Sequence, residues 1–338
     1  MEQINSKQDL INYFEKGCKK ENQLSIGVEH EKFIFDNSTN QRANFKTISK
    51  IFNFLEQFGW KPIKEKDYVV GLSREGQSIT LEPGNQIELS GAKLNSIHLN
   101  CSESYKYLDE LRKACKKLNL KMMSVSFDPF TKLEDAPQTP KQRYEIMTKE
   151  MPKDGKLSLH MMYQTCGTQI NLDYISEKDF IKKFKLSSFL APISIAIFAN
   201  SPIIENRLSG YLSYRSKVWQ NTSRAGLPNF FLEDMDFEKY TDFVINMPLL
   251  FVFKNSKHLD AEGKKFKDFM DGKLSILKNI KPNIVDFNNH LATIFTEVRL
   301  KKYIEIRSLD TCEWDCHCGG PAFYVGLLYG NLNEAFDI

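Results

Sequence analysis

Glutamate residues recur at alternating positions in short segments that have the pattern of β-strands. Glu29 and Glu31 lie two residues apart, and Glu82 and Glu88 flank a Pro-Gly turn. Because successive side chains of a strand point to opposite faces, residues two apart share one face of a sheet. Like charges on one face repel each other unless something cationic lies between them. The spacing therefore predicts a sheet face that gathers carboxylates around a cation.

Two later segments extend the same face. Gln169 and Asn171 alternate in one of them, and Glu305 and Arg307 alternate in the other, which follows Arg299. Mg²⁺ takes carboxylate oxygens together with substrate phosphates, in octahedral geometry. Arginine guanidinium groups neutralise phosphate or carboxylate charge through paired hydrogen bonds. Glutamates and arginines on one face thus indicate metal-assisted phosphoryl transfer, in which catalysis is mostly positioning and charge neutralisation.

The alternative is that these residues form solvated strand faces, whose cross-strand ion pairs each contribute less than about 1 kcal/mol. For any single glutamate this alternative is favoured, but it accounts less well for several strands that all carry carboxylates. Spacing alone takes the inference only as far as a Mg²⁺ site. The sequence contains neither a dinucleotide-binding fingerprint nor a P-loop, so a nucleotide would lie on the sheet face rather than on a helix N-terminus.

Length and composition limit the number of domains and the class of protein. The 338 residues allow one large domain or two ordinary ones. Lys and Arg number 46 against 43 Asp and Glu, and because the two signs are interspersed, the charge pattern is not that of a nucleic-acid-binding protein. Seven cysteines are too few for a disulfide scaffold, and the odd number leaves at least one thiol unpaired within the chain. Both features favour a reducing compartment.

The N-terminal segment contains no recognisable targeting signal. Residues 1–20 mix acids with lysines and contain no apolar stretch, which argues against a secretory signal and against a transit peptide. They predict a short amphipathic helix, with Leu10 and Phe14 on one side. The most apolar run, 189–199, is about half the roughly 20 residues that a membrane-spanning helix needs, and Pro192 interrupts it. We therefore expect a soluble, cytoplasmic protein without a membrane partner.

Two periodicities divide the rest of the chain. A period near 3.6 predicts helices at 45–58, 96–118, 178–199, 237–246 and 321–333. Alternation predicts strands at 25–36, 78–82, 86–90, 121–127, 168–173, 249–254 and 297–308. The strands are apolar on one side and polar on the other, which is typical of an antiparallel or mixed sheet with one face on helices and one face in water. We expect a single α+β domain over residues 1–338, in which helices pack on the outer face of a curved sheet.

Ten short segments, taken in order, resemble glutamate–cysteine ligase (γ-glutamylcysteine synthetase) of the plant and proteobacterial type. Together they run over nearly the whole chain, and ten matches in order are far more specific than any one. The segments are 26–33, 71–74, 82–91, 143–147, 165–173, 198–202, 215–219, 297–301, 305–307 and 321–329.

The resemblance implies a glutamine-synthetase-like fold, in which the concave face of a curved antiparallel sheet holds ATP, Mg²⁺ (or Mn²⁺) and glutamate. It implies an ATP-dependent ligation. The γ-carboxylate of L-glutamate attacks the γ-phosphate of ATP, and the amine of L-cysteine then displaces phosphate from γ-glutamyl phosphate. The product is γ-glutamylcysteine, on the way to glutathione. No side-chain nucleophile is needed, because the substrate carboxylate is the nucleophile.

Position within the motifs suggests a role for each residue. Arg299 and Arg307 are expected to hold the transferring phosphoryl group. Glu305 is counted with them as catalytic, as a ligand of the metal. Arg215 and Arg224 are candidates to clamp the α-carboxylate of glutamate, and Arg143 is a weaker candidate for the same task. The expected ligands of Mg²⁺, which bridges the phosphates and neutralises their charge, are Glu29, Glu31, Glu82, Glu88 and Glu305, with Gln169 beside them.

The cysteines near the C-terminus allow two interpretations. One interpretation is a zinc knuckle, formed by Cys312, Cys316, His317 and Cys318. It is the less favoured one, because no second pair of ligands with fitting spacing lies nearby. In the family that the chain resembles, Cys318 falls at one half of a regulatory disulfide of some plant members, and Cys101 falls at the other half. The resemblance therefore implies a Cys101–Cys318 disulfide as a hypothesis.

The chain also departs from the pattern of that family. The loop 219–224 is about two residues shorter than usual, and Ala225 stands where threonine is typical. The family normally continues for some tens of residues as a helical segment, whereas this chain stops at Ile338, so we expect that extension to be missing or shortened. Two alternatives stay open: a related ligase that joins glutamate to another amine, and a non-catalytic relative that binds Mg·ATP or glutamate. We expect a monomer or a weak homodimer.

Overall fold

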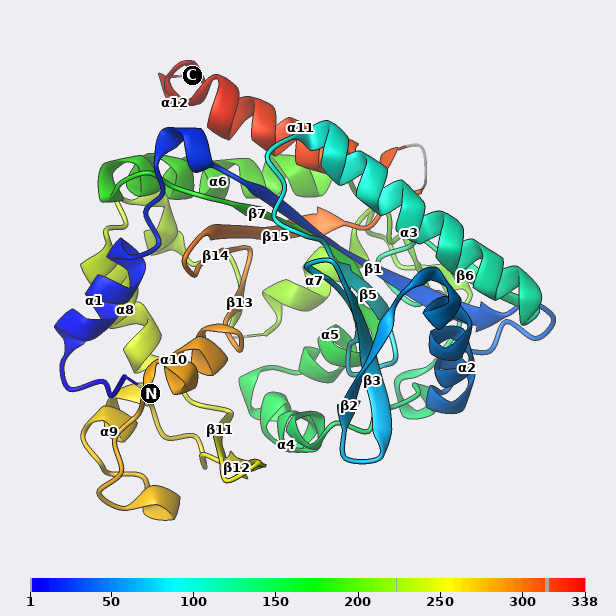
Figure 1. The fold of residues 1–338 in the computed structure, drawn as a ribbon, viewed down its shortest axis with the longest axis horizontal. Helices are drawn as coiled ribbons and strands as arrows, with labels where there is room; N and C mark the ends of the chain where they lie inside the picture. Colours follow the sequence, from blue (N-terminus) through cyan, green and yellow to red (C-terminus); the bar gives the residue numbers. More distant parts are fainter. Residues whose placement is uncertain (1, 223, 314–315, 338) are drawn as a thin grey trace.

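The computed structural model describes residues 2–222, 224–313 and 316–337. Its centre is a nine-stranded sheet in which every neighbouring pair is antiparallel, in the order β14-β15-β7-β1-β5-β4-β3-β2, with β6 paired to the far end of β1 (Figure 1). The strands are β1 Ile26–Asp36, β2 Lys61–Glu65, β3 Tyr68–Arg74, β4 Gln77–Leu81, β5 Ile87–Ser90, β6 Leu120–Met123, β7 Gly167–Leu172, β14 Val298–Leu300 and β15 Ile304–Asp310.

Four helices cover the outer face of this sheet. Figure 1 shows α3, α6 and α11 running along one side of it, with α2 against the β2–β4 end. Alternate strand residues Val28, Ile170 and Ile306 are buried in one apolar cluster with Phe180 and Phe184 of α6. Each fully buried side chain of this size stabilises the fold by about 1.5–3 kcal/mol. The helices are α2 Phe45–Leu55, α3 Ile97–Lys117, α6 Glu177–Ile197 and α11 Gly319–Val325.

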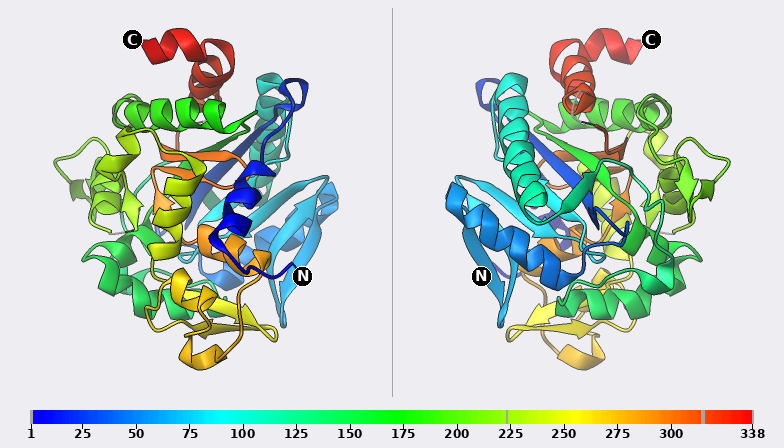
Figure 2. Two further views of the ribbon diagram at one scale, coloured as in Figure 1. Left: turned by 90° about the vertical axis from the view of Figure 1, so that its left-hand side faces the viewer. Right: turned by 90° about the vertical axis from the view of Figure 1, so that its right-hand side faces the viewer.

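A second group of elements covers the inner face. The two side views in Figure 2 show them as a separate layer, on the side of the sheet away from α6 and α11. They are α4 Gln142–Glu150, α5 Ser158–Gln164, α7 Tyr214–Gln220, α10 Ile284–Leu291, and the hairpin of β11 Phe251–Lys254 and β12 Lys257–Asp260.

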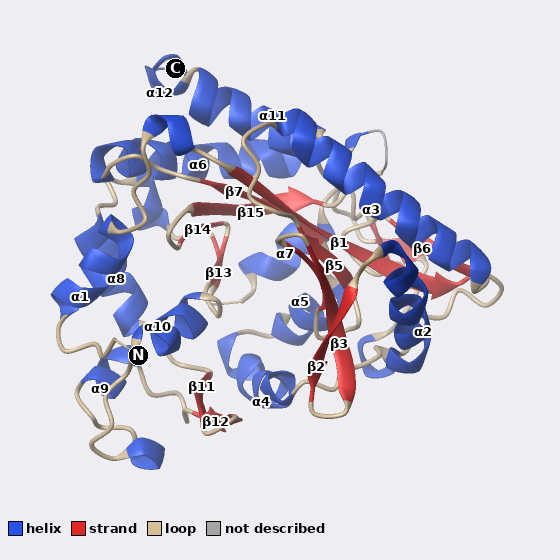
Figure 3. Cartoon of the chain, in the orientation of Figure 1, coloured by secondary structure: helices blue, strands red, loops and turns tan. Residues whose placement is uncertain are grey.

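The remaining elements lie around these layers, and Figure 3 distinguishes the helices from the strands in the same view as Figure 1. The N-terminal helix that the sequence predicts is present, begins after the Ser6 cap, and packs on α8. Among the described residues, no helix has both the length and the apolar character to cross a membrane. The elements are α1 Lys7–Glu15, α8 Phe237–Asn246, α9 Phe266–Met270, α12 Leu332–Asp337, β8 Ile203–Ile204, β9 Arg207–Leu208, β10 Ala225–Gly226 and β13 Phe295–Thr296.

The structure confirms the α+β class, the antiparallel sheet and the helices on its outer face. One expectation about the sheet is wrong, because its polar face does not lie open to water. All seven residues of β15 are buried, including Glu305 and Arg307. The alternation of polar and apolar residues predicts contact with water, but in β15 it arises from buried charges that pair with one another.

Strand boundaries differ from the predicted ones where a turn interrupts an alternating run. The expected strand 297–308 is a hairpin, in which β14 and β15 pair antiparallel and residues 301–303 form the turn. The expected strand 121–127 ends at Met123, and the sequence analysis missed β2 and β3 entirely. In β2 four of five residues are exposed, so the strand carries no burial pattern that alternation could reveal.

Candidate functional site

Four of the five predicted carboxylates converge on one cavity of about 220 Å³ on the inner face of the sheet. Glu29 and Glu31 reach it from β1, Glu88 from β5, and Glu82 from the turn that follows β4. Helix α4 and the segment 289–295 close the cavity on the other side. Its other lining residues are Arg143, Tyr144, Met147, Gln169, Phe251, His258, Asn289, Ala292, Thr293, Phe295, Arg299 and Arg307.

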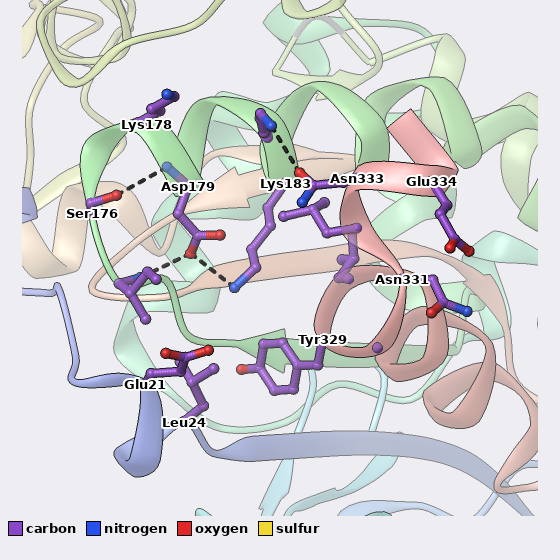
Figure 4. A pocket seen from close by; sticks show the side chains of 15 residues that line it. Glu21, Leu24, Ser176, Lys178, Asp179, Lys183, Tyr329, Asn331, Asn333 and Glu334 are labelled. Carbon is purple, nitrogen blue, oxygen red and sulfur yellow. Dashed lines mark hydrogen bonds and ion pairs between the residues drawn. The ribbon is translucent and has the colours of Figure 1, made fainter. Parts of the chain in front are cut away.

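A larger cleft of about 470 Å³ lies elsewhere, between the N-terminal end of α6 and residues 328–334 (Figure 4). The cation nearest its floor, Lys183, pairs with Asp179 at 2.9 Å. None of the predicted catalytic, substrate-binding or metal-binding residues lines this cleft. Size alone would therefore select the wrong place, whereas the spacing of the glutamates selects the smaller cavity.

Strand register brings two carboxylates face to face. Glu31 of β1 lies directly opposite Glu88 of β5 in the antiparallel pair. Glu31 accepts hydrogen bonds from the Gly167 backbone nitrogen at 2.7 Å and from Gln169 Nε2 at 2.9 Å, and Glu88 accepts one from Thr80 Oγ1 at 2.8 Å. Like charges directly opposite each other destabilise a sheet. The pair is therefore a place where a proton or a cation is favoured.

The protonation of the pair reflects this crowding. Burial, together with the charge of Glu82, raises the pKa of Glu31 to about 7, although Arg215 and Arg307 oppose the shift. Burial and the charge of Glu82 also raise the pKa of Glu88 well above its usual value. Near neutral pH these carboxyls therefore tend to hold protons, and a divalent cation would compete with those protons for the same oxygens.

Stability without metal should fall as pH rises through the pKa of Glu31. Between about pH 4.5, the ordinary value for a glutamate, and about pH 7, the folded chain holds a proton on Glu31 that the unfolded chain has lost. The favourable contribution is complete below the lower value and is lost above the higher one. We expect the free energy of unfolding, measured with urea in chelator, to fall less between pH 5.5 and pH 8 in Glu31→Gln than in the unmodified chain.

The exposed Glu145→Gln change is the matched control for this measurement, and it should keep the full pH dependence. An identical pH dependence in Glu31→Gln and the unmodified chain would contradict the raised pKa.

Glu305 lies in a different environment from the other acids. Its carboxylate is fully buried, and three cations contact it: Arg299 at 2.5 Å, Arg307 at 2.5 Å and Lys301 at 2.9 Å. Although burial alone would raise the pKa of Glu305, these cations hold it well below its usual range. Glu305 does not line the cavity. The structure thus separates it from the predicted metal ligands, because both its oxygens already accept from cations.

The two arginines on either side of Glu305 reach the cavity. Arg299 also donates from Nη1 to the carbonyl oxygens of Ile294 at 2.7 Å and Ala292 at 3.0 Å. Arg307 donates from Nη1 to Gln169 Oε1, and its guanidinium lies 5.2 Å from the ring of Trp219. Backbone carbonyls and Glu305 therefore fix the guanidinium group of Arg299, and Gln169 and Glu305 fix that of Arg307. Both cations face the acidic wall from defined positions.

Two of the three expected carboxylate clamps lie outside the cavity. Arg215 is fully buried, and its Nη2 donates to the carbonyl oxygen of Arg307 in β15 at 2.7 Å. Arg224 is fully buried as well, and its Nε contacts Asp154 at 2.5 Å. The structure changes the ranking from the sequence, because neither guanidinium group lines the cavity, although Nε of Arg215 is buried without a hydrogen-bond partner among the described residues. The weaker candidate, Arg143, is the one that lines the cavity.

Sequence reasoning missed three residues of the site. Asn171 donates to Glu29 at 2.8 Å, Lys301 pairs with Glu305, and the Tyr144 hydroxyl lies 3.5 Å from Glu82. Asn171 was noted on the polar face and could have been assigned from its register with β1. Lys301 and Tyr144 follow only from the β14–β15 turn and from the position of α4, which no local pattern indicates.

The C-terminal cysteine cluster is not assembled as a metal centre. In residues 2–222, 224–313 and 316–337, no three His, Cys, Asp or Glu side chains are placed to hold a metal ion by themselves. The structure joins Cys101 of α3 to Cys318 at the start of α11, with Cα atoms 5.8 Å apart. His317 stacks on His30 with ring centroids 3.4 Å apart, and burial lowers the pKa of both rings. His30 thus lies on the face opposite Glu29 and Glu31, as alternation predicts.

The acidic cavity nevertheless fits Mg²⁺, which differs from metals held in all-protein cages. Mg²⁺ keeps several waters and usually takes one or two carboxylates together with substrate phosphates. The opposed pair Glu31–Glu88 supplies such oxygens. Both carboxyls have raised pKa values, and within the described residues no cationic side chain forms a hydrogen bond with either of them. The oxygen-only donor set also matches the preference of this hard ion.

Comparison with known proteins gives a consistent family. The model of glutamate-cysteine ligase family 2 (GCS2) matches residues 25–338. The chloroplastic glutamate–cysteine ligase of Nicotiana tabacum is 43% identical over 332 residues, covering 97% of this chain and 64% of that protein. Glutamate–cysteine ligase B, chloroplastic, of Oryza sativa subsp. japonica is 45% identical over 328 residues, covering 96% of this chain and 66% of that protein. The chain thus spans just under two thirds of the length of these relatives.

The solved structures that match are more distant. A protein described as a novel glutamine synthase homolog is 13% identical, with a TM-score of 0.37, over 98% of this chain and 59% of that protein.

These relatives correct one expectation and establish one fact. The expected cytoplasmic location is contradicted, because the relatives are named chloroplastic. Composition and net charge bear on the solubility of a folded chain, but they do not specify the compartment in which it lies. The match of the family model over residues 25–338 and the identities above show that this chain belongs to glutamate-cysteine ligase family 2.

Proposed function

We propose that the cavity catalyses ATP-dependent ligation of the γ-carboxylate of L-glutamate to the amine of L-cysteine, through γ-glutamyl phosphate, to give γ-glutamylcysteine for glutathione synthesis. One observation carries the proposal. A single cavity has four carboxylates on one wall and three arginines, Arg143, Arg299 and Arg307, around it. Phosphoryl transfer to a carboxylate needs this combination, because both reactants are anions that must approach each other.

The acidic wall serves the metal–nucleotide complex in this proposal. Glu29, Glu31, Glu82 and Glu88 are the proposed ligands of Mg²⁺, with Gln169 beside them. The bound ion would neutralise phosphate charge. Hydrogen bonds from Asn171 to Glu29 and from Gln169 to Glu31 fix which way each carboxylate points. Such second contacts orient metal-binding groups before the ion arrives.

Arg299 and Arg307 hold the transferring phosphoryl group. Glu305 acts as a positioning residue, because it fixes both guanidinium groups from behind. Donors that are already fixed where negative charge develops stabilise a transition state without further reorganisation. The ATP terminal phosphate and the glutamate carboxylate then meet between the acidic wall and this arginine pair.

Arg143 binds the α-carboxylate of glutamate in this proposal. It lies at the cavity on α4, where Nη2 donates to the Tyr144 hydroxyl at 3.0 Å. We expect Arg143→Met to raise KM for glutamate about 10- to 100-fold, since a hydrogen bond to a charged group contributes about 1.5–3 kcal/mol. Steady-state kinetics measure KM, and urea denaturation of the same variant measures the free energy of unfolding, which should fall less than in Arg224→Met.

The matched comparison is Arg224→Met, which removes the buried contact with Asp154. It should lower the free energy of unfolding by about 3 kcal/mol and leave KM for glutamate unchanged in the folded fraction. If KM for glutamate changed only in Arg224→Met, the α-carboxylate of glutamate would be bound by Arg224, as the sequence favours, and not by Arg143.

Amine specificity separates the proposal from its nearest alternative. ADP release from ATP and glutamate is measured with cysteine and with a panel of other amino acids. We expect cysteine to give the highest kcat/KM. A clear preference for another amine would point to a related ligase, and binding of Mg·ATP in isothermal titration without any turnover would point to a non-catalytic relative.

A further inference from the structure

The guanidinium group of Arg307 is held at fewer points than that of its neighbour Arg299. Arg299 donates from Nε and Nη2 to Glu305 and from Nη1 to backbone carbonyls. Arg307 donates to Glu305 and Gln169 through the single nitrogen Nη1, and its buried Nε has no hydrogen-bond partner among the described residues. Hydrogen bonds at one nitrogen fix that atom, but they leave the tilt of the planar group free. A further contact is therefore needed to hold the plane.

The ring of Trp219 supplies a contact of this kind. The guanidinium carbon of Arg307 lies 5.2 Å from the centre of the ring, and that of Arg215 lies 4.2 Å from it. An indole ring attracts a guanidinium group at such distances, and the attraction is strongest where water is excluded. The side chain of Trp219 is only 6% exposed, and its Nε1 donates to Thr165 Oγ1 at 3.4 Å. The ring is therefore a fixed surface beside the planar group of Arg307.

Helix α7, which carries Trp219, is docked on β15, which carries Arg307. Arg215 and Trp219 lie four residues apart and therefore share one face of the helix. From that face, Arg215 Nη2 donates to the carbonyl oxygen of Arg307 at 2.7 Å. Ser213, the N-cap of α7, donates from Oγ to Asp310 of β15 at 3.1 Å. The helix thus holds Arg307 at the backbone through Arg215 and at the side chain through Trp219.

Gly167 of β7 leaves the space that this arrangement requires. A Cβ added at Gly167 would lie 2.8 Å from Nη2 of Arg215 and 3.2 Å from its guanidinium carbon, which is too close for the buried group to stay in place. The missing side chain lets the guanidinium of Arg215 lie against the backbone of β7. From there it reaches both the ring of Trp219 and the backbone of β15.

We propose that Trp219 is a positioning residue for phosphoryl transfer, and that its ring fixes the guanidinium plane of Arg307. The inference rests on the proposed ligase function and adds to it a residue that does not line the carboxylate cavity. Donors that are fixed before negative charge develops stabilise a transition state without reorganisation. Loss of the ring should therefore lower kcat, and should change KM for ATP and for glutamate less.

Trp219→Leu removes the ring and should lower kcat for cysteine-dependent ADP release about 3- to 30-fold, as the strength of a buried cation–π contact implies. Trp219→Phe keeps an aromatic face and should restore kcat to within about threefold of the unmodified chain. Trp60→Leu is the matched control, because Trp60 is also buried and its ring lies 4.1 Å from the guanidinium carbon of Arg74, outside the cavity. Trp60→Leu should lose stability but keep kcat in the folded fraction.

A double-mutant cycle tests whether Trp219 acts through Arg307. In the Arg307→Met background, Trp219→Leu should lower kcat by less than about twofold, because the group that the ring positions is already absent. A ring that contributes independently of Arg307 would instead multiply the two losses.

Fluorinated tryptophan decides the matter if Trp219→Leu does not fold. Each fluorine withdraws negative charge from the face of the ring and weakens its attraction for a cation, with little change of shape. The sequence contains three tryptophans, so the chain grown with mono- and difluorotryptophan is compared with Trp219→Phe grown in the same way. We expect kcat to fall with each fluorine in the unmodified sequence and to stay constant in Trp219→Phe.

Four results would each overturn Trp219 as a positioning residue while leaving the ligase proposal intact. They are an unchanged kcat in folded Trp219→Leu, an equal loss of kcat in Trp60→Leu, multiplied losses in the double variant, and a kcat that does not respond to fluorine. Absence of ADP release from the unmodified chain would instead overturn the proposed function, and the inference with it.

Discussion

Replacing Glu305 by glutamine should lower the free energy of unfolding by about 3–5 kcal/mol, which is the usual cost of removing one partner from a buried ion pair. Glu305 is fully buried and is the shared partner of Arg299, Lys301 and Arg307. A neutral amide keeps the shape of the side chain but leaves three cations without their common counterion. The change should also reduce ligation, because the two arginines lose the group that fixes their position.

Urea denaturation followed by circular dichroism measures this effect. Glu145→Gln, at an exposed position of α4, makes the same chemical change and should stay within about 0.5 kcal/mol of the unmodified chain. Adding Lys301→Met to Glu305→Gln removes one of the unpaired cations, and should recover part of the lost stability. Wild-type stability in Glu305→Gln alone would contradict the account of this cluster.

Replacing Arg307 by methionine should reduce kcat by about 10²–10³, the range seen when one fixed donor to a developing negative charge is removed. Arg307 faces the cavity between Gln169 and Glu305 and contacts both through Nη1. Arg307→Lys should restore little activity, since an ammonium group cannot reproduce the planar, paired donors of a guanidinium. The KM for glutamate should change less than kcat.

Steady-state ADP release measures both parameters. Arg207→Met, at an exposed arginine of β9 that pairs only loosely with Glu205 at 3.6 Å, is the matched control and should leave kcat unchanged. A kcat for Arg307→Met within threefold of the unmodified value would show that the phosphoryl group is held elsewhere.

The sequence predicts the acidic wall well because its placement depends on local rules. Alternation along β1 places Glu29 and Glu31 on one face, and the Pro-Gly turn brings Glu82 and Glu88 beside them. Antiparallel pairing with β7 then sets Gln169 directly across from Glu29. Each step needs only the period of a strand and the geometry of a neighbouring strand.

The arginines are harder to predict, because their roles depend on distant partners. Arg224 lies near Asp154, which is 70 residues away, and Arg215 reaches the backbone of Arg307, which is 92 residues away. Position within the motifs predicts that the side chains of both arginines face the substrate. In the folded chain, packing directs them into the protein interior instead. Arg143 lies at the cavity only because α4 packs against the β11–β12 hairpin, and no local pattern in the sequence indicates that contact.

The most direct test of the central claim is an assay of the chain with ATP, Mg²⁺, L-glutamate and L-cysteine, in which ADP release and γ-glutamylcysteine formation are followed together. We expect cysteine-dependent ADP release in a one-to-one ratio with γ-glutamylcysteine. We also expect Arg307→Met to slow both by the same factor. ADP release that does not depend on cysteine, or unchanged product formation by Arg307→Met, would contradict the central claim.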